Sequence, residues 1–209
     1  MPHTASRPAL GAAAALSALA GYVDGIAFIF LGGYFVSFMS GNTTAGSVDI
    51  VRGADWAIAF LLVVGFVAGV IAGTIVTRTR AAAWVLALVT ALLLVGTLLT
   101  EVGATAVIPS VIIAAGMGAV NTAFARDGQP AFGLTYMTGA LVSMAQGLVA
   151  AFTGGSRTAW IHHLVLWLAI ATGAVAGAAA YGWLGIRSLW IAVVVAAVAA
   201  VVALVRARR

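Results

Sequence analysis

The chain has 209 residues, of which 64% are hydrophobic and 7% charged, and its mean hydropathy is +1.16. This composition excludes a soluble globular domain and predicts a single integral membrane domain, residues 1–209, whose main partner is the lipid bilayer. The net charge of +5 does not indicate a nucleic-acid partner, because the ten basic residues, all Arg, stand at the ends of apolar runs. Such a placement is typical of a multi-pass protein of the bacterial inner membrane.

Six apolar runs are long enough to cross a bilayer, which needs about 20 residues per helix. In chain order they cover roughly residues 9–30, 56–76, 81–99, 105–124, 160–184 and 188–205. Two further segments, 33–51 and 131–152, are also long enough, but Gly and polar residues interrupt their middles. We therefore predict an all-α membrane protein with six transmembrane helices and two re-entrant or broken-helix segments.

Three blocks of sequence recur in the same order in the two halves of the chain. Gly21-Tyr-Val-Asp24 matches Gly118-Ala-Val-Asn121, Met39-Ser-Gly41 matches Met137-Thr-Gly139, and Gly65-Phe-Val-Ala-Gly69 matches Gly173-Ala-Val-Ala-Gly177. The pattern predicts one internal repeat over residues 7–100 and a second over 104–206. Three spans in each repeat would turn the second repeat upside down, which is the inverted 3+3 arrangement common among transporters.

The positions of the Arg residues favour six spans over eight. With six spans and cytoplasmic termini, only Arg52 and Arg187 lie outside. If segments 33–51 and 131–152 also cross the membrane, Arg78, Arg80, Arg126 and Arg187 lie outside instead, which is a weaker positive-inside bias. The eight-span topology, with two parallel 4+4 repeats, is the alternative.

Asp24 is the one acidic residue within an apolar run. A charged side chain at this depth costs about 2.5–3.5 kcal/mol, so it is expected to face a cavity or a partner. The chain has no Lys, and no Arg lies within a span, so an internal salt bridge is hard to build. Asp24 is therefore a candidate for proton coupling or cation binding. The alternative is a carboxylate near a helix end that accepts hydrogen bonds from the neighbouring Ser- and Thr-containing backbone.

The polar block after Asp24 is the second candidate site. A helix that breaks at mid-membrane exposes backbone groups that can bind a solute, and Gly41 permits a non-helical backbone there. Asn42 and Thr138 are expected to approach the membrane centre from opposite sides. Packing of small residues between helices is the alternative role of this block. The predicted solute-binding residues are Asp24, Ser40, Gly41, Asn42, Thr43, Asn121, Thr138 and Gly139.

Glycines recur every four residues at Gly65, Gly69 and Gly73, and again at Gly173 and Gly177. Such faces let two helix backbones approach closely. We expect them to pack the two repeats together or to form a contact between subunits of a homo-oligomer.

The chain carries no Gly-x-Ser-x-Gly or His-Glu-x-x-His motif and no close pair of carboxylates within a span. Neighbouring His162 and His163 point about 100° apart on a helix and do not suit one metal. No catalytic residue, metal or cofactor is therefore predicted. The function we expect is transport of a small solute, with a non-catalytic membrane subunit or assembly factor as the alternative and an intramembrane enzyme as a weaker one.

These blocks resemble a known group. Gly-Tyr-Val-Asp24, Leu31-Gly-Gly33, Phe35-Val-Ser-Phe-Met-Ser-Gly-Asn-Thr-Thr44 and Phe66-Val-Ala-Gly69 are similar to the YoaK-type family of small bacterial membrane proteins. The resemblance covers nearly the whole chain. It implies a multi-spanning inner-membrane protein of a family with no assigned activity, and it indicates no substrate.

Overall fold

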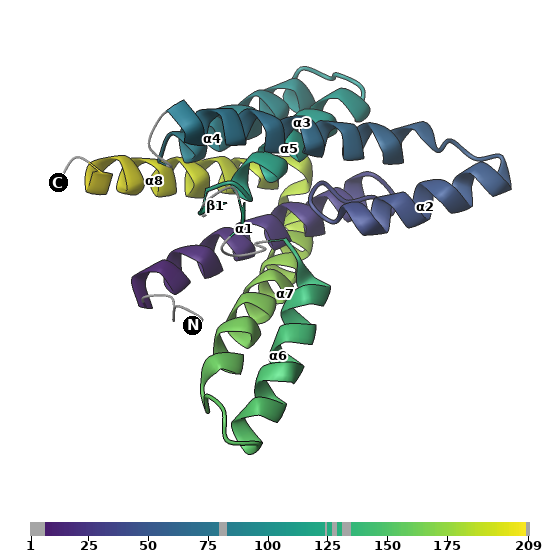
Figure 1. The fold of residues 1–209 in the computed structure, drawn as a ribbon. Helices are drawn as coiled ribbons and strands as arrows, with labels where there is room; N and C mark the ends of the chain where they lie inside the picture. Colours follow the sequence, from purple (N-terminus) through teal and green to yellow (C-terminus); the bar gives the residue numbers. More distant parts are fainter. Residues whose placement is uncertain (1–6, 80–82, 124, 127–128, 131–134, 208–209) are drawn as a thin grey trace.

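The computed structural model describes residues 7–79, 83–123, 125–126, 129–130 and 135–207. The regular secondary structure of those residues is helical, apart from one antiparallel pair of two-residue strands (Figure 1). The elements are α1 (Arg7–Phe30), α2 (Met39–Arg52), α3 (Ala57–Thr79), α4 (Ala83–Glu101), α5 (Val107–Val120), β1 (Ala125–Arg126), β2 (Gln129–Pro130), α6 (Met137–Phe152), α7 (Ala159–Leu184), the short 3₁₀ helix η1 (Gly185–Ser188) and α8 (Leu189–Ala207).

Four helical stretches are apolar and long enough to cross a membrane: Pro8–Phe30, Ala57–Thr79, Ala83–Glu101 and Ala159–Ala207. The last of them contains both α7 and α8, joined by η1. The protein is therefore an all-helical membrane protein, as predicted, and five of the six predicted runs match α1, α3, α4, α7 and α8 closely.

The sixth predicted run, 105–124, is longer than the helix it contains. Helix α5 has 14 residues, about 21 Å, which is less than the bilayer core of about 30 Å. The helix ends at Val120 because the next residues form tight turns, in which Thr122 N–H donates to the Ala119 carbonyl at 2.9 Å. The predicted full-length helix is wrong at this end.

Each interrupted segment contains a short helix, and the described residues directly before each helix are not helical. Helix α1 ends at Phe30, and Gly32 and Gly33 follow with φ angles of 69° and 117°, which suit glycine. The chain is then non-helical until Met39, where the 14-residue α2 begins. Helix α6, with 16 residues, likewise begins at Met137. At about 21 and 24 Å, α2 and α6 are, like α5, shorter than the bilayer core.

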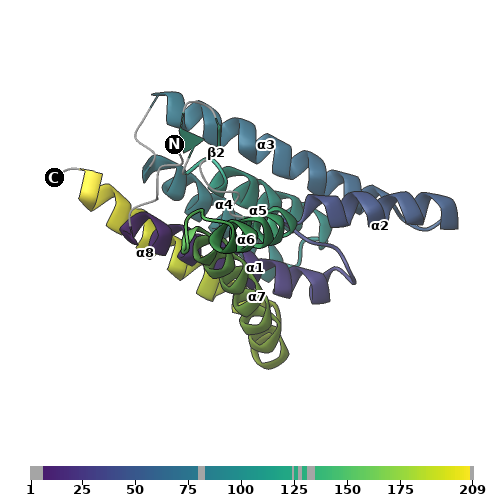
Figure 2. The ribbon, with the colours of Figure 1, turned by 60° about the horizontal axis from the view of Figure 1, so that its bottom comes forward.

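The two halves of the chain interleave. Helix α1 packs along α7, α3 packs along α5, and α4 packs against both α5 and α8. Side chains of α1 contribute much of the buried core, including Leu16, Leu19, Val23 and Ile26. In Figures 1 and 2, the turn between α2 and α3 lies at one end of the molecule, and α7 points in another direction. Helix α3 runs back beside α2, towards the centre of the molecule.

The glycine faces lie at the helix crossings inside the chain. A Cβ atom on Gly69 would overlap the carbonyl oxygen of Ala115 in α5, and one on Gly177 would overlap that of Tyr22 in α1. Glycine is required at both positions because the two helix backbones are in direct contact there. These faces are filled by helices of the same chain, and homo-oligomer formation stays a prediction.

Candidate functional site

Asp24 holds the connection between α1 and α2 with three hydrogen bonds. The backbone N–H groups of Val36 and Ser37 both donate to Asp24 Oδ1 at 2.8 Å, and the Ser37 hydroxyl donates to Oδ2 at 2.5 Å. The Asp24 side chain is buried, with 9% of the residue exposed. Both carboxylate oxygens are therefore occupied by groups that a non-helical backbone would otherwise leave without partners.

Asn42 holds the same connection from the other side. Its Oδ1 accepts a hydrogen bond from the Phe35 N–H at 2.8 Å, and its Nδ2 donates to the Phe35 carbonyl at 2.6 Å. Asn42 is fully buried in the first turn of α2. One amide side chain thus satisfies both polar backbone groups of Phe35, so Asp24 and Asn42 converge on residues 35–37.

Tyr34 fixes the start of the connection to the far end of α2. Its hydroxyl donates a hydrogen bond to Asp49, which lies seven residues beyond Asn42 on the same face of the helix. Residues 34 and 35 therefore lie against α2 while the chain runs in the opposite direction. The chain therefore enters this region without helical structure and leaves it as the short helix α2.

The second half of the chain repeats parts of this arrangement. The Thr135 hydroxyl donates to Asn121 Oδ1 at 3.3 Å, as Ser37 does to Asp24. Phe38 and Tyr136, the residues before α2 and α6, have nearly equal backbone angles, φ −97° and ψ 76° against φ −94° and ψ 71°. The sequence match between the two blocks therefore extends to local structure.

Gly41 has a different role from the one predicted. It lies within α2 and is helical, so the expectation of a non-helical backbone at this residue is wrong. Its missing side chain makes room for the Phe38 ring, because a Cβ atom would lie 2.5 Å from Phe38 Cδ1. Gly139 in α6 likewise leaves room for the ring of Tyr136, the residue before that helix. The break in the helix lies upstream, at residues 31–38.

Helix α2 presents a polar face outside the packed core. Ser40, Thr43, Thr44 and Ser47 are all exposed. The hydroxyls of the last three donate to the carbonyls one turn earlier in their own helix, which keeps them compatible with an α-helix. A shallow groove of about 450 Å³ runs along this side of α2, over Thr43, Thr44 and Ser47. Thr138 of α6 is also exposed.

Asn121 stands apart from the other candidates. Its side-chain amide donates to the Met117 carbonyl at 2.9 Å and accepts from Thr135. No hydrogen bond joins Asn121 to Asp24 or Asn42 in the part of the chain that the structure describes. The structure thus brings Asp24 and Asn42 together around one connection and places Asn121 at the matching point of the second half.

Three important residues were not among the predicted site. Ser37 is the direct partner of Asp24, and Tyr34 and Phe35 complete the connection. Their position just before the Met-Ser-Gly-Asn block was a usable signal, because a helix that starts inside a membrane leaves the preceding backbone to be satisfied. Among the described residues, no group of three or more His, Asp or Glu side chains is placed to hold a metal ion.

Comparison with known proteins places the chain in a family. The family model described as "Protein of unknown function (DUF1275)" matches residues 12–202. The UPF0700 transmembrane protein RA0705 of Rhizobium meliloti (strain 1021) is 39% identical over 175 residues, which cover 81% of this chain and 74% of that relative. No solved structure gives a significant match. The resemblance to a membrane family without an assigned activity is thereby confirmed, and the chain belongs to the DUF1275 family.

Proposed function

We propose that this protein transports a small solute, as a transporter or channel of the bacterial inner membrane. The observation that carries the proposal is the pair of short helices, α2 and α6, that begin at matching points of the two halves, each directly after described residues that are not helical. Transporters use such interrupted segments to place backbone and side-chain polar groups at mid-membrane. A protein that needed only to anchor itself would not require buried polar side chains such as Asp24 and Asn42.

The proposal includes six spans with both termini in the cytoplasm. Arg187 Nε lies 3.8 Å from Glu101 Oε1, so the end of α4 and the link between α7 and α8 lie at the same end of the molecule. In the six-span topology both residues are periplasmic. In the eight-span topology they would lie on opposite sides of the membrane. The ion pair therefore supports six spans, and with them two inverted 3+3 repeats over residues 7–100 and 104–206.

Labelling of single cysteines separates the two topologies sharply, because the chain has no Cys of its own. We expect a Thr79→Cys variant to react with an impermeant maleimide only from the cytoplasmic side, and a Val102→Cys variant only from the periplasmic side. The eight-span topology reverses both results. Labelling of intact cells and of inverted vesicles gives the measurement, and reversed labelling at both positions would overturn the six-span topology.

In the proposed mechanism, the solute passes along the polar face of α2 and the starts of the two short helices. Ser40 and Thr43 offer hydroxyls on that face, and Thr138 offers one at the start of α6. Gly41 and Asn42 shape the connection before α2. In the second half, Asn121 matches Asp24 and Gly139 matches Gly41. Asp24 is the titratable group of the site, and protonation would weaken its hold on Val36 and Ser37 and let the first connection move.

The neutral isostere Asp24→Asn tests the coupling role. We expect the variant to fold and to lose the pH dependence of solute flux in proteoliposomes, because Asn keeps the shape and one acceptor but cannot titrate. Asp55→Asn is the matched control, since Asp55 is exposed at the start of α3 and bonds only to nearby backbone. An unchanged pH profile for Asp24→Asn contradicts coupling through Asp24.

A non-catalytic membrane subunit is the second candidate. It is favoured by the complete set of hydrogen bonds around Asp24, which needs no solute to be satisfied. Flux by the purified protein in proteoliposomes, measured over a panel of small metabolites, distinguishes the two candidates, because a subunit without its complex should carry none.

A further inference from the structure

A small cavity lies where the two halves of the chain meet, near the start of α5. Its volume is about 10 Å³, close to the room that one water molecule needs. Phe30, Val36 and Thr100 line it from the first half of the chain, and Ser110 and Ile186 line it from the second half. The cavity therefore lies between the α1–α2 connection, the end of α4, the start of α5 and η1.

The cavity contains polar groups in an otherwise apolar wall. Ser110 is 3% exposed. One turn before Thr100, the hydroxyl of Thr97 is buried and, among the described residues, has no hydrogen-bond partner. Buried hydroxyls without partners cost free energy, so they are expected where water or a polar solute visits. Val36 connects the cavity to the candidate site, because its N–H is held by Asp24.

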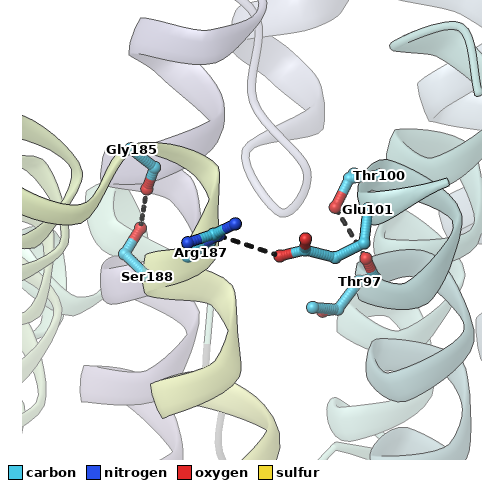
Figure 3. Close-up of polar contacts among 6 residues, drawn as sticks. All are labelled: Thr97, Thr100, Glu101, Gly185, Arg187 and Ser188. Carbon is cyan, nitrogen blue, oxygen red and sulfur yellow. Dashed lines mark hydrogen bonds and ion pairs between the residues drawn. The ribbon is translucent and has the colours of Figure 1, made fainter. Parts of the chain in front are cut away.

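An ion pair joins the two sides of this cavity. Glu101 follows the lining residue Thr100 at the end of α4, and Arg187 follows the lining residue Ile186 in η1 (Figure 3). The Arg187 side chain is 77% exposed and that of Glu101 32% exposed, so the pair lies at the surface of the protein, next to two residues that line the cavity. The two residues come from different halves of the chain.

The two sides of the pair are anchored differently. On the η1 side, the Ser188 hydroxyl donates to the Gly185 carbonyl at 2.7 Å, and the Tyr22 hydroxyl donates to the Ser188 carbonyl at 3.0 Å. The first bond lies within η1, and the second ties η1 to α1. On the other side, the Thr100 hydroxyl bonds only within α4, to the Thr97 carbonyl at 2.6 Å. The contact between Arg187 and Glu101 thus joins η1 to the end of α4 (Figure 3).

We propose that the Glu101–Arg187 pair is the periplasmic gate of the solute path, and that the cavity behind it is the closed end of that path. The proposal rests on the transport function proposed above. An exposed pair with a 3.8 Å separation adds little to the stability of the fold, so it can open without unfolding the protein. Opening would separate the end of α4 from η1 and let water reach Ser110.

The gate can be tested without knowing the solute. In a Ser110→Cys reporter, reaction with an impermeant maleimide from the periplasm should be slow. Adding Glu101→Gln or Arg187→Gln should raise the rate by up to about fivefold, the range that an exposed ion pair can supply. The exchange Glu101→Arg with Arg187→Glu should return the rate towards that of the reporter alone.

Two controls make the result specific. Arg52→Gln removes an exposed Arg that the same topology places in the periplasm, and it should leave the rate unchanged. Val102→Cys, at a residue that is 77% exposed, should react equally in all backgrounds and so reports reagent access. If Ser110→Cys does not fold, Thr100→Cys on the opposite wall of the cavity is the reporter.

Unchanged labelling in both neutral variants overturns the gate, and so does a charge exchange that fails to slow the reaction again. The proposed transport function is judged separately by flux. Gated labelling without flux for any solute contradicts transport alone, whereas flux with labelling that ignores the ion pair contradicts the gate alone.

Discussion

Gly69→Leu and Gly177→Leu should each prevent the protein from assembling. At both positions the backbone of another helix occupies the space that a Cβ atom would need: Ala115 in α5 for Gly69, and Tyr22 in α1 for Gly177. Backbone atoms cannot rotate aside as a side chain can. The cost should therefore exceed the roughly 1–3 kcal/mol of ordinary overpacking, and the melting temperature should fall by at least about 6 °C.

The measurement is folded yield in detergent by size-exclusion chromatography, together with thermal unfolding followed by Trp fluorescence. Gly182→Leu is the matched control on α7, because Gly182 is exposed and a Cβ atom there meets nothing within 4 Å. The control should unfold at the temperature of the unmodified protein. Normal yield and melting temperature for both Gly69→Leu and Gly177→Leu would refute the close approach of the helices.

These contacts explain why the glycine pattern could be read from the sequence. A face with a small residue on every turn has few uses in a membrane helix other than close packing. The pattern does not say which helix approaches it, because α1 meets α7 and α3 meets α5 only in three dimensions. Packing between the halves and contact between subunits were therefore equally consistent with the sequence.

The position of the helix break was harder to predict. Ser40, Gly41, Thr43 and Thr44 suggested a break at their own positions, yet all four are helical. The Thr43 hydroxyl bonds to the Met39 carbonyl and that of Thr44 to the Ser40 carbonyl, so polar side chains here fit a helix well. The break lies at residues 31–38, where Gly32 and Gly33 end α1.

Two other features depend on contacts that no local pattern reveals. Asn121 and Thr122 after Val120 are followed by the apolar Ala123 and Phe124, so hydropathy averaged over the run extends α5 beyond its actual end. Two of the three hydrogen bonds to Asp24 come from backbone N–H groups, which every residue except proline possesses and which therefore leave no mark on the sequence. The sequence nevertheless left two roles open for Asp24, as a ligand site or as a support for the nearby backbone. The three hydrogen bonds to residues 36 and 37 show the supporting role directly.

That supporting role predicts a large loss of stability for Asp24→Ala. The substitution leaves the N–H groups of Val36 and Ser37 buried without an acceptor, at about 1–3 kcal/mol for each. The first connection would loosen, and Asn42 alone would hold it to α2. We expect the melting temperature to fall by about 5–15 °C, measured by Trp fluorescence in detergent.

Asp24→Asn should lower the melting temperature by less than half as much as Asp24→Ala. An Asn side chain keeps one oxygen for both N–H groups, and its amide nitrogen can donate to the Ser37 hydroxyl, which then accepts. Asn121 shows an amide in the matching position, where it accepts from Thr135. Ser37→Ala, which removes only one hydroxyl, should cost about 1 kcal/mol.

If Asp24→Asn is as unstable as Asp24→Ala, the charge of Asp24 supports the connection, and hydrogen-bond acceptance does not. If Asp24→Ala melts like the unmodified protein, Asp24 does not hold the connection.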